Sequence, residues 1–247
     1  MKSRKVERLT REHAKLANLD VNYALADGEE PSTKSGWHVD EVRSTVGFES
    51  PGEPVVGGAW EVARALVRGY EFADPKILQG VFGRDAPVLG CDMLLEGHFY
   101  GLRFYLGVRV TGVTDETRLV GDPQRVWGWH YETLEGHLEQ GRLTYEVLKH
   151  LETGEVEFVV SGFSRRAPIP NPIIGLGFRI FGRWTQRRFY RACINRMVDL
   201  VAAGVAGHPL PTPQPLSADS ALVLAPSDAA SPPIEPVAPA SSSPGAS

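Results

Sequence analysis

Apolar and polar side chains alternate along the middle of the chain, which is the pattern of strands with one buried face. Every second residue from Leu102 to Val110 is apolar. A second alternation places four side chains on one strand face: Trp127, Trp129, Tyr131 and Thr133. Further strands are expected over residues 37–48, 94–100 and 143–147, and a turn at Glu152-Thr153-Gly154 leads into another strand over residues 156–160.

Helical spacing flanks this strand-rich region. Before it, four apolar residues recur at i, i+3, i+7 and i+10: Trp60, Ala63, Val67 and Tyr70. Asp74-Pro75 ends that helix, because a residue before proline avoids the helical conformation, and a second short helix is expected from Pro75. The longest helix is predicted from about residue 174 to residue 204, with an apolar face made of Phe189, Cys193, Met197 and Leu200. This order of elements predicts an α+β fold in which a curved antiparallel sheet wraps around the long C-terminal helix.

The two ends of the chain differ in composition from the region between them. Residues 1–36 mix seven Lys or Arg with six Asp or Glu, which predicts a polar arm that is partly helical. Residues 37–206 are expected to form a single α+β domain. Residues 207–247 hold 10 of the 19 prolines and no Lys, Arg or aromatic residue, so we expect a disordered Ala/Pro/Ser-rich tail. Its apolar run from Ala221 to Ala225 is interpreted as compositional, with a docking peptide as the alternative.

Charge and cysteine content limit the class of protein. The chain carries 26 Lys and Arg against 30 Asp and Glu, a net charge of −4, which excludes a uniformly basic nucleic-acid-binding protein. No stretch approaches the roughly 18 consecutive apolar residues of a membrane span, and the first thirty residues lack the apolar core of a signal peptide. Cys91 and Cys193 are too few for a disulfide framework or a cysteine-based zinc site. We therefore expect a soluble, cytoplasmic protein with no cofactor, no nucleic-acid partner and no stable membrane insertion.

One motif carries a family resemblance. The stretch Trp129-His130-Tyr131-Glu132-Thr133-Leu134-Glu135-Gly136-His137 resembles the Tyr-Gly-Thr-Leu-Pro-Gly-His core of an uncharacterised family of domains of unknown function. Gly36-Trp37-His38-Val39-Asp40 and Pro170-Asn171-Pro172 agree with the same family, and the resemblance spans about residues 36–201. The chain departs from the commonest core at Glu132 and Glu135, where many members have Gly and Pro.

That family is remotely similar to the START-related (SRPBCC) helix-grip superfamily, in which a sheet curls around the C-terminal helix and leaves an apolar cavity. The resemblance implies this shape and supplies no reaction. A small apolar or amphipathic molecule is the ligand such a cavity would take. The predicted lining is Trp129, Tyr131, Thr133, His137, Tyr145, Phe158, Phe189 and Met197. The alternative is that the aromatic side chains simply fill the core.

His137 and Tyr131 are the candidates for catalysis, and they support an alternative function as an enzyme of modest acid–base chemistry. A histidine that follows Gly136 in a turn is placed to reach a pocket mouth and titrates near neutral pH. The competing interpretation is that His137 caps the turn. No metal is predicted, because His130 and Glu132 alternate with the aromatic side chains and their spacing to His137 and Glu139 matches no standard zinc template.

Arginine is concentrated towards the C-terminal helix. Eight Arg and no acidic residue lie between residues 165 and 196. Arg183, Arg187 and Arg188 are candidates for anion binding, because guanidinium groups hold phosphate or carboxylate. These arginines also fit two other roles: balancing the helix dipole and the acidic remainder of the chain, or contacting an acidic partner in an interaction protein.

Overall fold

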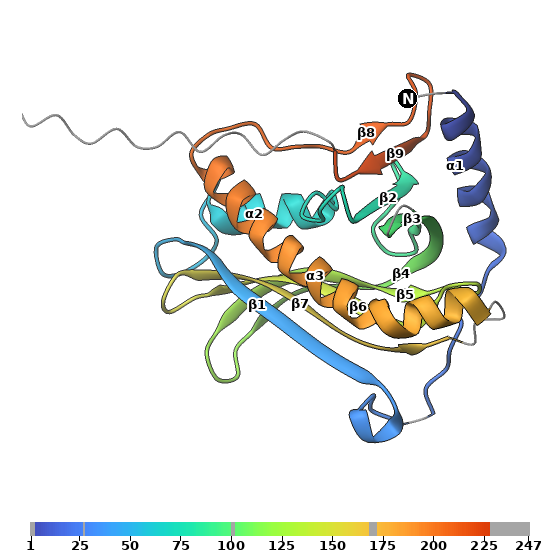
Figure 1. Cartoon of the computed structure of the whole chain (residues 1–247). Coiled ribbons are helices and arrows are strands. Elements are labelled where there is room, and N and C mark those ends of the chain that lie inside the picture. The colour runs from blue at the N-terminus through green and yellow to red at the C-terminus, as the bar shows by residue number, and fades with distance from the viewer. Residues whose placement is uncertain (1–2, 27, 100–101, 168–171, 228–247) are drawn as a thin grey trace, which may run out of the picture.

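The computed structural model describes residues 3–26, 28–99, 102–167 and 172–227. Within them one antiparallel sheet has the strand order β1-β7-β6-β5-β4-β3-β2-β9-β8 (Figure 1). The strands are β1 (His38–Phe48), β2 (Leu78–Gly83), β3 (Asp92–Phe99), β4 (Leu102–Arg118), β5 (Gln124–Thr133), β6 (Glu139–His150), β7 (Glu155–Arg166), β8 (Gln214–Pro215) and β9 (Leu222–Ala225).

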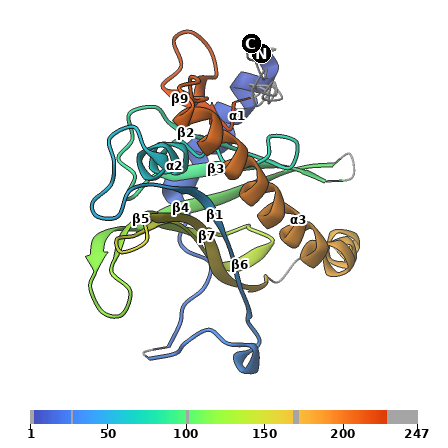
Figure 2. The ribbon, with the colours of Figure 1, turned by 90° about the vertical axis from the view of Figure 1, so that its left-hand side faces the viewer.

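Two helices pack on one face of this sheet. The long helix α3 (Pro172–Val205) runs obliquely past the strands and packs mainly against β1 and against α2 (Ala59–Arg68) (Figure 2). Gly204, near the end of α3, lies against Val62 of α2 so closely that a Cβ atom there would be 2.7 Å from the valine. The α+β class and the curved sheet packed against a long C-terminal helix are therefore confirmed.

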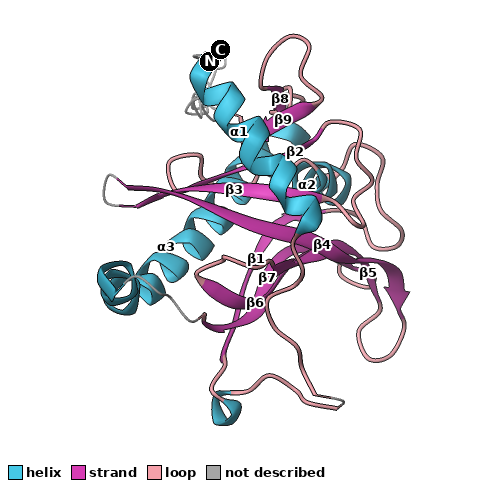
Figure 3. Ribbon diagram, turned by 90° about the vertical axis from the view of Figure 1, so that its right-hand side faces the viewer, coloured by secondary structure: helices cyan, strands magenta, loops and turns pink. Residues whose placement is uncertain are grey.

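The strands bury two separate apolar clusters because neighbouring residues of a strand point to opposite faces. In β3, Met93 and Leu95 belong to the main core beneath α2 and α3, whereas Leu94 belongs to a second cluster. That second cluster contains Leu9 of α1 (Ser3–Lys15) and Leu16 of the short 3-10 helix η1 (Leu16–Asn18). Figure 3 shows α1 lying across β2 and β3. A further 3-10 turn, η2 (Thr33–Ser35), precedes β1.

The C-terminal segment differs from the expectation of a disordered tail over residues 207–227. Strand β9 pairs with the edge of β2, from Gly80 opposite Ala225 to Gly83 opposite Leu222. Leu216 and Val223 are buried. The prediction failed because it rested on composition, whereas a four-residue strand needs only alternating apolar side chains and an unpaired sheet edge. The docking-peptide alternative for Ala221–Ala225 describes this segment better; residues 228–247 lie outside the described residues.

A second local expectation was also wrong. The short helix expected from Pro75 is replaced by a turn followed by β2, which pairs with β3. Residues 78–83 gain ladder hydrogen bonds on both sides, from β3 and β9, and this tertiary pairing overrides the local helical signal. No helix among the described residues is long and apolar enough to cross a membrane.

Candidate functional site

Three tyrosines from different elements meet in the main core, and we call them the tyrosine cluster: Tyr70, Tyr131 and Tyr145. Tyr131 lies on β5, Tyr145 lies on β6, and Tyr70 follows the end of α2. The ring centroid of Tyr145 is 6.0 Å from that of Tyr131 and 6.2 Å from that of Tyr70. All three side chains are buried.

Other aromatic rings surround the tyrosine cluster. Register brings Trp129 directly opposite Tyr145, with ring centroids 5.1 Å apart. The ring centroid of Phe72 is 4.5 Å from that of Tyr145 and 5.2 Å from that of Phe158 on β7. The indole nitrogen of Trp129 donates a hydrogen bond to the carbonyl of Val67 at 3.1 Å, which ties β5 to α2. From α3, Phe189, Cys193 and Met197 are buried in the same core.

Two of the tyrosine hydroxyls make no well-formed hydrogen bond to a described residue. Those of Tyr70 and Tyr145 are buried and make no hydrogen bond of acceptable geometry with a described residue. The Tyr145 hydroxyl lies near enough to those of Tyr70 and Tyr131 for weak side-chain hydrogen bonds within the cluster to affect their ionisation. Burial raises the pKa of all three tyrosines well above the ordinary value of 10, so the hydroxyls stay protonated and are available as donors.

Tyr70 has an unusual backbone conformation. Its φ is +58°, in the left-handed region that a bulky residue rarely adopts. It occupies the position after the α2 cap in a Schellman motif, in which Tyr70 N–H donates to Val67 and Glu71 N–H donates to Leu66. Glycine usually fills that position because it has no side chain to strain. Holding a tyrosine there costs on the order of 1 kcal/mol and directs its ring into the core.

Most of the predicted cavity residues lie together, with two exceptions. Trp129, Tyr131, Tyr145, Phe158, Phe189 and Met197 all belong to the main core. The Thr133 hydroxyl is engaged by hydrogen bonds elsewhere, donating to Asn22 Oδ1 at 2.7 Å and accepting from Gly141 N–H at 3.0 Å. Tyr70 and Phe72 were not among the predicted site residues. Tyr70 ended the predicted apolar face of α2, but no local signal announces its left-handed conformation.

His137 is the other exception, because its imidazole makes the bond of a turn cap. Its Nδ1 accepts the N–H of Glu139 at 2.9 Å, and no hydrogen bond to Tyr131 accompanies it among the described residues. Desolvation lowers the pKa of His137 to about 4, so the ring is neutral at physiological pH. The contact agrees with the turn-cap interpretation, and the catalytic use of His137 and Tyr131 stays a prediction.

The polar face of β5 is covered by the N-terminal arm. Tyr23 donates a 2.6 Å hydrogen bond to Glu132, which also pairs with Arg142 at 3.0 Å. His130 on the same face is partly buried, and burial lowers its pKa. Among the described residues no group of three or more His, Cys, Asp or Glu side chains is placed to hold a metal ion.

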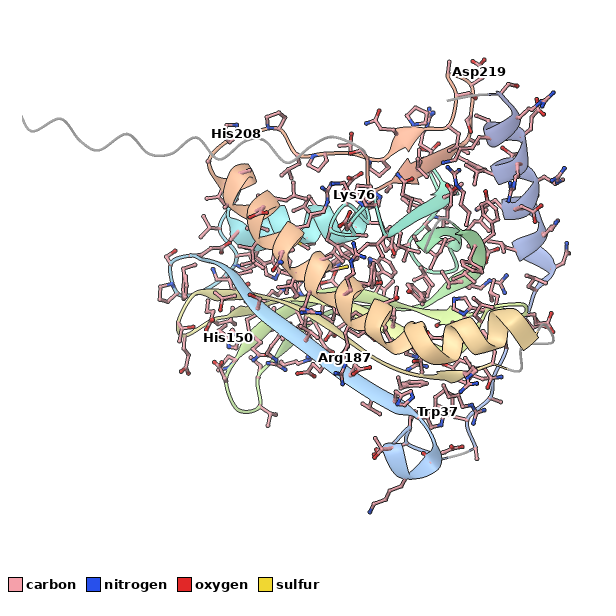
Figure 4. The ribbon with its side chains drawn as sticks, viewed as in Figure 1. Trp37, Lys76, His150, Arg187, His208 and Asp219 are labelled. Atoms are coloured by element: carbon pink, nitrogen blue, oxygen red, sulfur yellow. The ribbon has the colours of Figure 1, made fainter. Side chains whose placement is uncertain are left out.

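Two of the three candidate anion-binding arginines have side chains that the structure describes. The Arg183 side chain lies outside the described part of the structure. Arg187 and Arg188 are exposed on α3. Figure 4 shows Arg187 where α3 passes β1, on the outside of the molecule. Anion binding by these residues stays a prediction, and no described side chain joins them to the tyrosine cluster.

The fold and the site together define an α+β domain whose antiparallel sheet and C-terminal helix enclose a buried aromatic cluster. The chain belongs to the family described as Domain of unknown function (DUF1990), which matches residues 22–196. The match begins within the arm, at the residues that bond to β5: Asn22 and Tyr23. Comparison with curated proteins gives no match.

Three solved structures illustrate what the chain is similar to. Ara h 8.0201 has a TM-score of 0.40 and 13% identity, with 68% of this chain and 99% of that chain covered. A point mutant of Thalictrum flavum norcoclaurine synthase, in complex with a transition state analogue, has a TM-score of 0.42 and 11% identity, with 67% and 93% covered. The hypothetical protein jhp0584 from Helicobacter pylori has a TM-score of 0.41 and 11% identity, with 72% and 96% covered.

Proposed function

We propose that this protein binds a small, largely apolar molecule beside the tyrosine cluster, between the sheet and α3. The observation that carries the proposal is the pair of buried hydroxyls on Tyr70 and Tyr145, which make no well-formed hydrogen bond to a described residue. Small-molecule sites are mostly apolar and contain a few polar groups that orient the ligand. The aromatic surroundings and the two hydroxyls have this composition.

The energetics explain why the hydroxyls call for a function. A buried hydroxyl without a partner costs about 1–3 kcal/mol, and phenylalanine would fill the same space without that cost. At Tyr70 a hydroxyl without a well-formed hydrogen bond coincides with a strained backbone. Two such costs at one place are the pattern expected where binding, and not stability, is served.

The chemistry of the hydroxyls indicates what the ligand carries. Because the raised pKa values keep them protonated, each offers an O–H donor. We infer that the ligand presents an acceptor oxygen, such as a ketone, ester or ether, on an otherwise apolar skeleton. We also propose that the protein works in the cytoplasm, which the two free cysteines, Cys91 and Cys193, support.

Titration with Prodan, an uncharged naphthyl ketone whose emission reports its surroundings, tests the proposal. We expect saturable, near-stoichiometric binding to the full chain. Tyr70→Phe and Tyr145→Phe should each weaken it about 5- to 10-fold, the value of one net hydrogen bond. Tyr105→Phe is the matched control, because that ring packs in the second cluster. Absence of saturable binding to the wild type, or equal affinity in all four proteins, would contradict the proposal.

A further inference from the structure

Strand β1 is an open edge of the sheet. Ten of its eleven residues pair with β7, with an irregularity at Val46, and no backbone hydrogen bond from a described residue reaches its other side. The opposite edge of the sheet ends in β8, which is two residues long. An open strand of this length presents a row of unpaired N–H and C=O groups, to which an extended segment can add.

Helix α3 borders the same edge with positive charge. The helix packs mainly against β1, and Gln186 donates a 3.2 Å hydrogen bond to Ser164, the residue of β7 that pairs with His38 of β1. Arg187 directly follows Gln186, and both Arg187 and Arg191 are exposed. Neither forms an ion pair with a described residue; Arg191 only donates a 3.4 Å bond to the Arg187 carbonyl.

The spacing of the two exposed arginines on α3 matches the spacing of alternate side chains on a strand that would pair with β1. Arg187 and Arg191 are four residues apart on a helix, a rise of about 6 Å. Alternate residues of an extended strand are about 6.6–6.8 Å apart and point to the same side. A strand added to β1 would therefore carry every second side chain past the α3 arginines at nearly their own spacing.

We propose that the β1 edge and the α3 arginines form a docking surface for an extended acidic peptide segment. Its backbone would pair with β1, and alternate Asp or Glu side chains would pair with Arg187 and Arg191. A second copy of this chain fits less well, because two-fold pairing through β1 would bring the arginine-bearing helices of both copies to the same junction. The surface lies outside the tyrosine cluster, so this proposal stands independently of small-molecule binding.

Fluorescence anisotropy with the full chain tests the proposal. The probe is a labelled peptide of about ten residues that alternates glutamate with threonine, a residue suited to strands. Two changes should each weaken binding more than 10-fold: Arg187→Glu with Arg191→Glu in the protein, and N-methylation of alternate backbone nitrogens in the peptide. The first removes the charge match, and the second removes strand pairing while leaving the protein untouched.

The matched control is Arg4→Glu with Arg11→Glu, the same charge change on the exposed side of α1. It should leave the affinity within about two-fold, and circular dichroism checks that both variants fold. Three results would overturn the proposal: no binding by the wild type, equal binding of the N-methylated peptide, or equal loss in the α1 control. Effective competition by single-stranded DNA or anionic vesicles, or dimerisation that blocks the peptide, would assign the surface to a different partner.

Discussion

Two tyrosines of this domain, Tyr23 and Tyr145, occupy opposite chemical situations. Tyr23, in the N-terminal arm, donates its hydroxyl to Glu132 at 2.6 Å, and Glu132 is held in turn by Arg142. Tyr145, in the main core, is completely buried and its hydroxyl has no partner of acceptable geometry among the described residues. The arm therefore docks through satisfied polar contacts, whereas the core keeps polar groups unsatisfied at a place where apolar ones would fit.

The difference distinguishes contacts that stabilise the fold from groups that we propose bind a ligand. Two buried charged groups elsewhere are paired: Lys149 contacts Glu49 at 2.7 Å and the Glu53 carbonyl at 2.8 Å, and Glu96 contacts Lys5 at 2.8 Å. Leaving one partner of such a pair alone is costly, so these contacts fix the structure. The hydroxyls of Tyr70 and Tyr145 make no well-formed hydrogen bond to a described residue, and this is why we assign them to a ligand.

The largest expected loss in the free energy of unfolding comes from removing the C-terminal segment that pairs with β2. Truncation after Gly207 removes the buried side chains of Leu216 and Val223, and leaves the buried carboxylate of Glu71 without the Ser227 N–H that it accepts at 2.9 Å. Burying each apolar side chain contributes about 1.5–3 kcal/mol, so we expect a loss of about 4 kcal/mol or more in urea unfolding. Truncation after Ser227 keeps every described contact and is the control. A melting temperature equal for both truncations would show that the segment adds nothing.

A smaller effect is expected from the capped turn at His137. Its pKa of about 4 lies below the ordinary value of 6.5, so the unfolded chain takes up a proton first as the pH falls. Stability contributed by the neutral ring is present above pH 6.5 and is lost between pH 6.5 and 4. Because the ring is partly exposed, solvent screening reduces the loss to about 2 kcal/mol.

Unfolding of His137→Asn measured across that range checks this prediction, since Asn keeps an acceptor but does not titrate. Its stability should depend less on pH between 4 and 6.5 than that of the wild type. His150→Asn is the control. Burial alone would lower the pKa of His150, but hydrogen bonds to Asp122 and Glu157 raise it, so its contribution is lost above pH 6.5. Parallel pH curves for wild type and His137→Asn would refute the assignment.

The fold could be predicted from the sequence wherever its signal is local and periodic. The alternation in β4, β5 and β7 depends on one buried face, and the apolar stripe of α3 depends on the helical period. The predictions for residues 75–83 and for residues 207–227 were wrong for a common reason. Strands β2 and β9 stabilise each other by pairing across more than 130 residues of chain, and neither composition nor helix-start signals report a partner so distant.

The candidate site was predictable in composition and not in geometry. The aromatic residues of β5, β6 and β7 were identified because they share strand faces. Thr133 was predicted to line the cavity, but its hydroxyl donates a hydrogen bond to Asn22, which lies 111 positions earlier in the chain. Tyr70 joins the tyrosine cluster because its backbone is left-handed, a conformation that sequence reasoning assigns to glycine. Both features are consequences of tertiary contacts.

The smallest expected change in the free energy of unfolding comes from removing single hydroxyls. It is also the most direct test of the difference between Tyr23 and Tyr145. Tyr23→Phe removes a hydroxyl bonded to a carboxylate and should lower the free energy of unfolding by about 1 kcal/mol. Tyr145→Phe removes a hydroxyl without a well-formed hydrogen bond to a described residue, so the free energy of unfolding should stay constant or rise by up to about 1 kcal/mol. Both are measured by urea unfolding of the protein purified without added ligand. The opposite signs matter more than the sizes, because each substitution deletes the same atom. A loss at Tyr145 as large as that at Tyr23 would mean that its hydroxyl is bonded in the folded protein, and the strongest support for the ligand site would be gone.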